Sequence, residues 1–238
     1  LVACSLQGTK PEGALLANID LEALLRLAKA HSVSAMVCMA LEQTDEFQHA
    51  AETTRLKWLD SKNKAVRKNM LLEIEFAENG IWYMPLKGSI LKEWYPKFGM
   101  REMADNDILF DATRRQQVRD IFVNRGYSIE SYNKSNHDAY EKQPVYNFEM
   151  HVALFHEDYS TLQKKYENVV DRLVQDEKLP FRYHFTPEDF YVFVVAHAYK
   201  HYSHGGTGIR TLADFYVMNR KLGKTLDWEY VESELRSL

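Results

Sequence analysis

The sequence predicts an α+β protein in which a small mixed β-sheet lies between an N-terminal and a C-terminal helical region. Three observations predict this class. Apolar residues recur with helical spacing in the first third of the chain and again in the last third. Between them, short apolar runs alternate with amphipathic helical patterns and are followed by further strand-like runs. We therefore expect three regions, 1–80, 81–158 and 159–238.

Helix start and stop signals organise the first region. Asp20 is the predicted N-cap of an amphipathic helix, and a second helix is predicted at 34–41. A third, highly charged helix is predicted at 45–78, with Gly80 at its C′ position. Its middle carries the basic residues Lys57, Lys62, Lys64, Arg67 and Lys68. These indicate either a solvated helix face or a surface that faces a polyphosphate or an acidic partner.

The middle region supplies the predicted sheet. Strands are predicted at 81–84, 106–110, 127–132, 138–142 and 145–153. Helices are predicted at 89–95 and at 112–125, the second of which ends at Gly126. Because a proline cannot donate a hydrogen bond to a ladder, Pro85 predicts that the first strand lies at an edge of the sheet or ends there.

The last region is predicted to be helical. Helices are expected at 161–174, from Pro187 to about Tyr202, at 209–220, and from Asp227 onward. Thr186 followed by Pro187 is a strong helix start, with threonine as N-cap and proline at the first helical position. The glycine-rich loop 205–208 lacks the Gly-Lys-Ser/Thr of a phosphate-binding P-loop, so it predicts a flexible connection.

Composition narrows the classes of function. The 238 residues carry a net charge of −4, which gives no global basic character of the kind that nucleic-acid binding favours. Cys4 and Cys38 have neither metal-site spacing nor a disulfide pattern, so a reducing cytoplasm is the expected setting. No apolar run approaches the ~18 residues of a membrane helix. The chain begins at Leu1 and stops at Leu238 inside a predicted helix, so the native protein is expected to extend further.

The stretch 86–111 contains the residues that indicate a chemistry. A Gly88-Ser89 pair closes a predicted strand and opens a short helix, and backbone N–H groups at such a turn suit a phosphate. Asp105 and Asp107 lie two residues apart at the next strand, so their side chains should share one face. Two adjacent carboxylates repel unless a cation or a proton lies between them, and magnesium prefers such oxygen ligands. Together these features predict a metal-dependent nucleotidyl-transfer site.

The same residues resemble a known family. Gly-Ser followed by Asp-x-Asp is similar to the nucleotidyltransferase fold of the DNA polymerase beta superfamily. The longer pattern resembles one bacterial branch, the uncharacterised nucleotidyltransferase family. It comprises Leu86-Lys87-Gly88, Tyr95-Pro96, and the run Arg101-x-Met103-x-Asp105-x-Asp107. The resemblance implies a polymerase beta-like mixed sheet at the centre of the α+β fold.

The resemblance also implies a third carboxylate on a neighbouring strand. In 145–155 the residues Asn147, Glu149 and His151 alternate onto one face, and the family's Glu-x-His corresponds to Glu149 and His151. Two magnesium or manganese ions held by Asp105, Asp107 and Glu149 would orient an acceptor hydroxyl and stabilise the departing pyrophosphate. The structural alternatives are capping acids at a strand end and a solvent-facing strand residue.

Other residues are implied to contact the nucleotide. Gly88 and Ser89 would touch the triphosphate, while Lys87 and Arg101 would either bind phosphate or form salt bridges with nearby acids. Trp82, Trp94 and Tyr95 would stack on a base or pack in the core. A further set resembles the family's C-terminal helices and would close over the nucleotide or acceptor: His197, Lys200, His201, Arg210 and Asp214.

Alternatives for the C-terminal residues stay open. Arg210 and Asp214 at i,i+4 spacing can form a buried ion pair. His197, His201 and His204 share one side of a helix, which is compatible with zinc and would predict a zinc-dependent hydrolase with stoichiometric metal.

The leading functional prediction is transfer of a nucleoside monophosphate from a nucleoside triphosphate (ATP or another NTP), with magnesium or manganese as cofactor. The acidic net charge favours a small-molecule or protein acceptor over long nucleic acid. The alternative is a catalytically inactive nucleotide-binding or protein-interaction module with the same fold. Asn106 favours that alternative, because the family usually has an apolar residue between the two aspartates and a buried amide needs partners.

Overall fold

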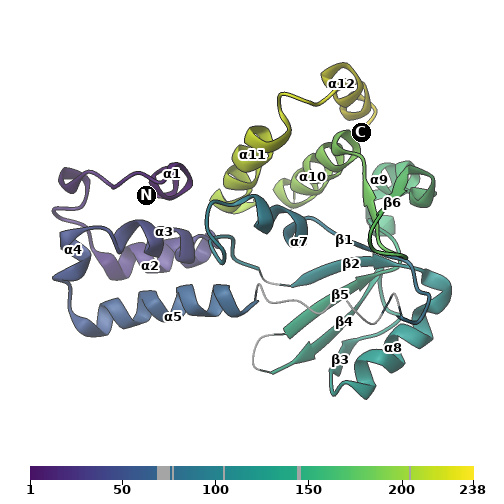
Figure 1. Cartoon of the computed structure of the whole chain (residues 1–238), viewed down its shortest axis with the longest axis horizontal. Helices are drawn as coiled ribbons and strands as arrows, with labels where there is room; N and C mark the ends of the chain where they lie inside the picture. The colour runs from purple at the N-terminus through teal and green to yellow at the C-terminus, as the bar shows by residue number, and fades with distance from the viewer. Residues whose placement is uncertain (69–75, 77, 104, 144–145, 204) are drawn as a thin grey trace. The chain divides into compact units, whose positions relative to one another are not determined.

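The structure is a computed structural model that describes residues 1–68, 76, 78–103, 105–143, 146–203 and 205–238 (Figure 1). The chain forms two compact units, each built from segments that are distant in the sequence. The first unit comprises Leu1–Met70, Leu91–Met103 and Gly205–Lys221, and the second comprises Leu71–Ile90, Ala104–His204 and Leu222–Leu238. The division into 1–80, 81–158 and 159–238 stays a prediction of regions along the chain.

The first unit is helical. Its elements are α1 (Val2–Gln7), η1 (Gly13–Leu15), α2 (Leu21–Ala30), α3 (Ser34–Leu41), α4 (Asp45–Gln48), α5 (Glu52–Lys68), η2 (Lys92–Trp94) and most of α11 (Gly208–Leu222). The Asp20 side chain accepts hydrogen bonds from the backbone N–H groups of Glu22 and Ala23, which confirms the predicted N-cap of α2. Helix α3 has the predicted bounds.

The core of the first unit draws on all three of its segments. Trp58 and Met36 are fully buried, and Tyr95 and Val217 pack in the same cluster. Trp94 packs against that cluster as well. Of the two roles considered for Trp94 and Tyr95, base stacking and core packing, the structure therefore has both residues in core packing. The helices of this unit are therefore held together by contacts between residues more than a hundred positions apart.

The single helix predicted at 45–78 is wrong in its first part. Thr44 caps the short helix α4, which ends at Gln48, and α5 begins only at Glu52. The backbone N–H of Ala50 donates to Phe47 O, which tightens the last turn, and Ala51 O starts the new helix by accepting from Thr54 and Arg55. Residues 69–75 and 77 of the predicted helix lie outside the described residues. Gly80 has a φ of 65°, as predicted for a C′ position.

Two of the basic residues on α5 have acidic partners. Lys57 Nζ lies 2.7 Å from Glu22 Oε1, and Lys62 pairs with Glu42. Both partners belong to the same unit, so these two lysines form ion pairs within the protein, an exposed one at Lys57 and a half-buried one at Lys62. The two interpretations of the basic helix face stay predictions.

The second unit contains a five-stranded mixed sheet of order β1-β2-β5-β4-β3. Its strands are β1 (Tyr83–Pro85), β2 (Asn106–Phe110), β3 (Ser128–Ser131), β4 (His137–Lys142) and β5 (Tyr146–His151). The β2–β5 pair is parallel and the other neighbours are antiparallel. This confirms the predicted α+β class, the bounds of β2 and the edge position of the strand that contains Pro85.

An aromatic core lies against one face of this sheet. Phe122 on α8 (Arg115–Asn124) stacks on Tyr140, with ring centroids 4.4 Å apart, and also contacts Phe148. Phe148 and Met150 are buried in this core, whereas Asn147 and Glu149, which alternate with them, are only half-buried. The alternation of β5 therefore sends its polar residues to the opposite face, where the candidate site lies.

The remaining elements of the second unit are α7 (Gly88–Leu91), η3 (Ala112–Arg114), η4 (Glu157–Tyr159), α9 (Ser160–Lys165), η5 (Val169–Arg172), β6 (Leu173–Gln175), β7 (Tyr183–Phe185), α10 (Pro187–Tyr202) and α12 (Trp228–Arg236). Thr186 accepts from Asp189 N and Asp227 accepts from Tyr230 N, which confirms both predicted helix starts. In the described ranges, no helix is long and apolar enough to cross a membrane.

The helix predicted at 161–174 is wrong in its second half. Helix α9 ends at Lys165, and after a 3₁₀ turn the chain enters β6, which pairs antiparallel with β7. Val174 lies in β6, where its β-branched side chain favours extended structure over helix. Pairing with β7, which a helical periodicity does not reveal, decides the outcome.

Candidate functional site

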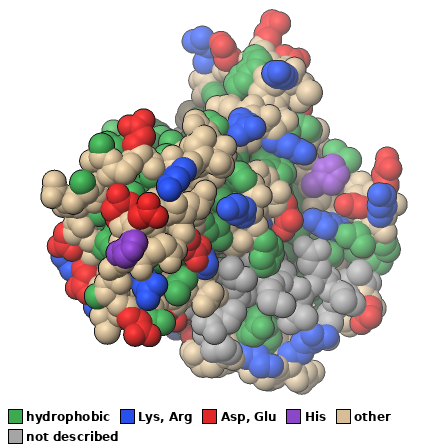
Figure 2. Space-filling view, turned by 60° about the vertical axis from the view of Figure 1, so that its left-hand side comes forward, with side chains coloured by type: hydrophobic (Ala, Val, Ile, Leu, Met, Phe, Trp, Pro, Cys, Tyr) green, Lys and Arg blue, Asp and Glu red, His purple; other side chains and the backbone are tan. Residues whose placement is uncertain are grey.

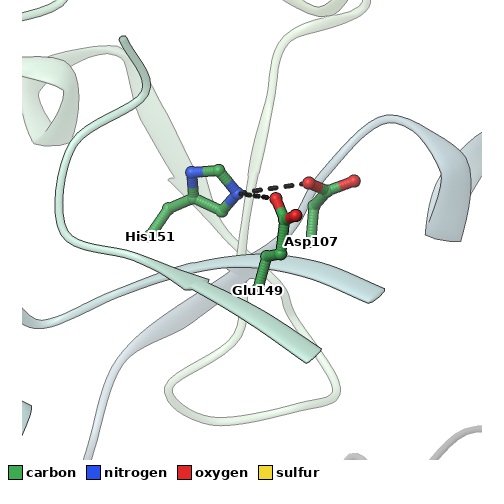
Figure 3. Close-up of side chains that lie close together, drawn as sticks. All are labelled: Asp107, Glu149 and His151. Carbon is green, nitrogen blue, oxygen red and sulfur yellow. Dashed lines mark hydrogen bonds and ion pairs between the residues drawn. The ribbon is translucent and has the colours of Figure 1, made fainter. Parts of the chain in front are cut away.

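The parallel pairing of β2 with β5 brings three chemically active side chains together. Asp107 is the register partner of Glu149, and His151 lies two residues further along β5. Because alternate strand residues point to the same face, all three side chains rise from one side of the sheet (Figure 3). One ligand atom from each residue lies within 4.8 Å of the other two.

A single ring nitrogen of His151 faces both carboxylates (Figure 3). The Nε2 atom is 3.1 Å from Asp107 Oδ1 and 3.5 Å from Glu149 Oε2. Dashed lines in Figure 3 mark both contacts. The exposed fraction of the side chains rises from 9% for His151 through 17% for Asp107 to 31% for Glu149. The cluster is therefore anchored at the edge of the core and opens toward solvent at Glu149.

A half-buried lysine adds a positive charge to this cluster. Lys87 lies in the turn between β1 and α7, and its Nζ atom is 3.4 Å from Asp107 Oδ1. Burial would raise the pKa of Asp107, but the Lys87 ammonium and the hydrogen bond from His151 outweigh it and hold the pKa well below its usual range. Asp107 is thus an anion.

Two histidines respond to this environment in opposite ways. Burial lowers the pKa of His151, but its hydrogen bonds to Asp107 and Glu149 outweigh burial and raise that pKa above its ordinary value. Burial and the nearby Lys87 ammonium hold the pKa of His197 well below its ordinary value, so this ring is neutral. His197 lies on α10, with its Nε2 atom 2.8 Å from Lys87 Nζ.

The predicted residues Lys200 and His201 lie on the same helix. Lys200 Nζ lies 5.2 Å from the centre of the Tyr159 ring, and burial together with Lys87 lowers the pKa of Lys200. His201 is exposed, and its Nε2 atom lies 3.2 Å from that of His197. Their predicted contact with a nucleotide stays a prediction. Of the histidines considered for zinc, His204 lies outside the described residues, and His197 is engaged by Lys87.

The Gly88-Ser89 turn uses part of its backbone internally. Ser89 N donates to Leu86 O and Ile90 N donates to Lys87 O, at 3.0 and 3.1 Å. The Ser89 hydroxyl is buried and has no hydrogen-bond partner among the described residues. A phosphate at this turn would therefore engage the Ser89 hydroxyl rather than the Ser89 amide, and the roles of Gly88 and Ser89 stay predictions.

Asp105 is placed apart from the cluster of three. It is half-buried, precedes the first residue of β2, and has interactions of its own. Within the described ranges, the group of metal-compatible side chains contains Asp107, Glu149 and His151 but not Asp105. The role of Asp105 as a third carboxylate ligand therefore stays a prediction.

Sequence reasoning missed His137 as a neighbour of the site. His137 is the register partner of His151 on the adjacent strand β4, and the two ring centroids are 5.2 Å apart. The strand was predicted to begin at Asp138, one residue late. His137 is identified by its pairing with His151 on β5. The local sequence of β4 gives no information about that pairing.

Asn106 is buried beside the site, as expected for the first residue of β2. Its Nδ2 atom donates to Asn147 O at 3.0 Å, across the β2–β5 pair. Its Oδ1 atom has no hydrogen-bond partner in the described part of the chain. The amide thus cross-links the two strands that carry Asp107 and Glu149. At the other end of β2, Trp82 contacts the Tyr183 ring edge to face, with centroids 6.0 Å apart, as in core packing.

Three predicted nucleotide-contacting residues belong to the first unit. Arg101 and Asp214 form a buried bidentate ion pair, with Nε–Oδ1 at 2.8 Å and Nη2–Oδ2 at 2.9 Å. Tyr95 OH also donates to Asp214 Oδ1 at 2.7 Å, and Arg210 Nη1 donates to Glu102 O at 3.2 Å. For Arg101 the salt-bridge alternative is realised, and Asp214 pairs with Arg101 rather than with Arg210.

Comparison with known families agrees with the resemblance seen in the sequence. Residues 17–238 match the family described as uncharacterised nucleotidyltransferase. The chain belongs to this family. No curated protein matches the sequence significantly.

Solved structures give weaker likenesses. The lincosamide antibiotic adenylyltransferase LnuA, in its lincomycin-bound form, is 20% identical with a TM-score of 0.29, covering 43% of this chain. The chain spans only 55% of the length of LnuA. The antibiotic-resistance factor ANT(2'')-Ia is 14% identical with a TM-score of 0.46, over 79% of this chain and 92% of its own. A nucleotidyltransferase-like protein from Paracoccidioides brasiliensis is 12% identical with a TM-score of 0.43, over 67% and 75% of the two chains.

Proposed function

We propose that this protein is a metal-dependent transferase that moves a nucleoside monophosphate from a nucleoside triphosphate to a small-molecule or protein acceptor. The observation that carries the proposal is the placement of Asp107 and Glu149 as register partners on adjacent parallel strands. Lys87 Nζ lies 3.4 Å from Asp107 Oδ1, so the cluster combines carboxylate ligands for a metal with an ammonium group that suits a phosphate oxygen.

The donor set of the cluster fits a divalent cation. Asp107 and Glu149 offer oxygen atoms of the kind that magnesium and manganese prefer, while the Nε2 atom of His151 hydrogen-bonds to Asp107 Oδ1. These atoms lie within 4.8 Å of one another, close enough to share one ion. Asp107 and Glu149 would hold the metal, with Asp105 as the proposed further ligand. The bound metal would neutralise charge on the triphosphate and on the departing pyrophosphate.

The chain's own side chains would act around this metal. His151 orients Asp107 through their 3.1 Å hydrogen bond. Lys87 supplies an ammonium for a phosphate oxygen, and the Ser89 hydroxyl lies in the same turn. As the acceptor oxygen bonds to the α-phosphorus, the α–β phosphoanhydride bond breaks and pyrophosphate leaves. Glu149, the most exposed of the three, takes the proton of the acceptor hydroxyl.

The surface charge favours a compact acceptor over a long polyanion. Figure 2 shows Lys and Arg side chains interspersed with Asp and Glu side chains, in keeping with the net charge of −4. Long nucleic acids are bound through many phosphate contacts and so favour a basic stripe. A small molecule or a protein is therefore the proposed acceptor. Both cysteines are free thiols, and we place the reaction in the cytoplasm.

The test is transfer of label from α-labelled nucleotides. The purified protein is incubated with each of the four NTPs, magnesium or manganese, and a lysate of the source cells. We expect label on an acceptor with the native protein and with the control Asp120→Asn, whose carboxylate is exposed. We expect none with Asp107→Asn/Glu149→Gln. Absence of transfer, together with absence of metal-dependent nucleotide binding by calorimetry, would favour the inactive-module alternative instead.

A further inference from the structure

Lys87 is shared between two partners that differ in charge. Its Nζ atom lies 2.8 Å from the Nε2 atom of His197 and 3.4 Å from the Asp107 carboxylate. The lysine side chain is only 15% exposed, and its backbone adopts a φ of 30°. A positive φ is costly for a residue other than glycine, so the turn holds this lysine in place at an energetic cost.

The direction of the Lys87–His197 hydrogen bond follows from chemistry. An ammonium only donates, so the Nε2 atom of His197 must accept and the proton of the neutral ring lies on Nδ1. His197 thereby offers the ammonium a neutral partner on α10, away from the carboxylate. His201 Nε2 lies 3.2 Å from the same acceptor atom and supports the ring from the next turn of the helix.

We propose that Lys87 is the internal counter-ion of Asp107, that a divalent cation displaces it, and that His197 is the positioning residue that receives the displaced ammonium. The proposal rests on the proposed function, since it assigns the metal to the Asp107 cluster. It goes further than the proposed function because Lys87 and His197 would together set the affinity of the site for the metal ion.

The electrostatics of the cluster require such an arrangement. A half-buried anionic carboxylate is stabilised by a cation beside it, and in the described structure Lys87 and the His151 ring lie next to Asp107. A divalent ion on the same oxygen atoms would repel an ammonium at 3.4 Å strongly. The ammonium then needs a second acceptor within reach, and His197 is already within hydrogen-bond distance. Glu149 and Lys200 also face this space from β5 and α10.

The two residues should affect metal affinity in opposite directions. Lys87→Met removes the competing charge, so nucleotide-free protein should bind Mn²⁺ about tenfold more tightly. His197→Leu removes the neutral acceptor and leaves Lys87 with Asp107 alone, so Mn²⁺ binding should weaken about threefold to tenfold. His197→Gln restores an acceptor and should bind nearly as the native protein does.

The measurement is the concentration of free Mn²⁺ by electron paramagnetic resonance, with the full chain and no nucleotide. His184→Leu is the matched control, because this histidine lies on β7 and bonds to a backbone oxygen. Adding His197→Leu to Lys87→Met should not change the Mn²⁺ affinity further, because the ammonium that His197 would receive has been removed. Weaker binding by Lys87→Met, or equal binding by His197→Leu and the native protein, would overturn the proposal.

A second readout needs no metal and no activity. In EDTA, Lys87→Met should lower the unfolding midpoint, because Asp107 loses its counter-ion, and adding Asp107→Asn should restore it. An unchanged midpoint in Lys87→Met would contradict the counter-ion role. If the native protein binds no Mn²⁺, or if Asp107→Asn binds it equally well, the displacement is refuted. Normal Mn²⁺ binding with these variant effects but no nucleotide transfer would refute the proposed function alone.

Discussion

Two clusters, one in each unit, place a carboxylate beside a basic side chain, yet they differ in how completely their charges are paired. In the first unit, Asp214 receives two hydrogen bonds from Arg101 and one from Tyr95, and the geometry is bidentate. In the second unit, Asp107 has the looser Lys87 contact at 3.4 Å, and Glu149 beside it is partly exposed.

The difference teaches how to separate a structural ion pair from a site. A bidentate pair with a third donor satisfies its charges within the protein and has little left for a ligand. A carboxylate held by a single-point ammonium, next to a second carboxylate and an imidazole, retains capacity for a cation.

The largest effect should follow from changing Asp107. Asp107→Asn removes an anionic ligand without changing the side-chain volume, so nucleotidyl transfer should fall by about 10³-fold while the protein stays folded. Initial rates of label transfer and the far-ultraviolet circular dichroism spectrum measure the two effects. Transfer at the native rate would show that Asp107 has no part in the chemistry.

Breaking the pair in the first unit should affect stability instead. Arg101→Met leaves the Asp214 carboxylate buried without its bidentate partner, which should cost about 3–5 kcal/mol in the free energy of unfolding. Urea denaturation measures this cost. Lys57→Met, which breaks the exposed pair with Glu22, is the control and should change little. A small loss in Arg101→Met would mean that the pair is not structural.

A bound metal ion should stabilise the folded protein through the Asp107 cluster alone. At a Mn²⁺ concentration of about 100 times its dissociation constant, the native protein should gain about 2.7 kcal/mol relative to EDTA. Arg119→Met, at an exposed pair on α8, should keep this gain, and Asp107→Asn should lose it. Thermal unfolding with and without the ion makes the comparison. A gain that persists in Asp107→Asn would place the ion elsewhere.

The smallest effect concerns Tyr95. Burial raises the pKa of Tyr95 well above its ordinary value, so the neutral phenol donates to Asp214 at any physiological pH. Tyr95→Phe removes one donor but leaves the Arg101 pair, and should cost about 1–2 kcal/mol. Chemical denaturation would detect this, with transfer activity as a separate readout. A cost equal to that of Arg101→Met would show that the phenol, not the bidentate pair, satisfies Asp214.

Much of the fold follows from local signals. The caps at Asp20, Thr186 and Asp227 each depend on a side chain and backbone groups within three residues, so their positions could be predicted. The errors at 45–78 and 161–174 have the same origin. A helical periodicity continues across the break at 49–51, and it does not reveal that β6 pairs with β7.

Strand patterns and turn chemistry are local, so the α+β class and the edge position of Pro85 could be predicted from the sequence, and the family resemblance added Asp105, Asp107, Glu149 and His151 as candidate residues. The partners that these residues meet depend on the tertiary structure. It set Glu149 opposite Asp107, directed Lys87 to His197 and Asp107, and paired Arg101 with Asp214. Such pairings join segments tens to more than a hundred residues apart, and their energies depend on burial and geometry that no local pattern specifies.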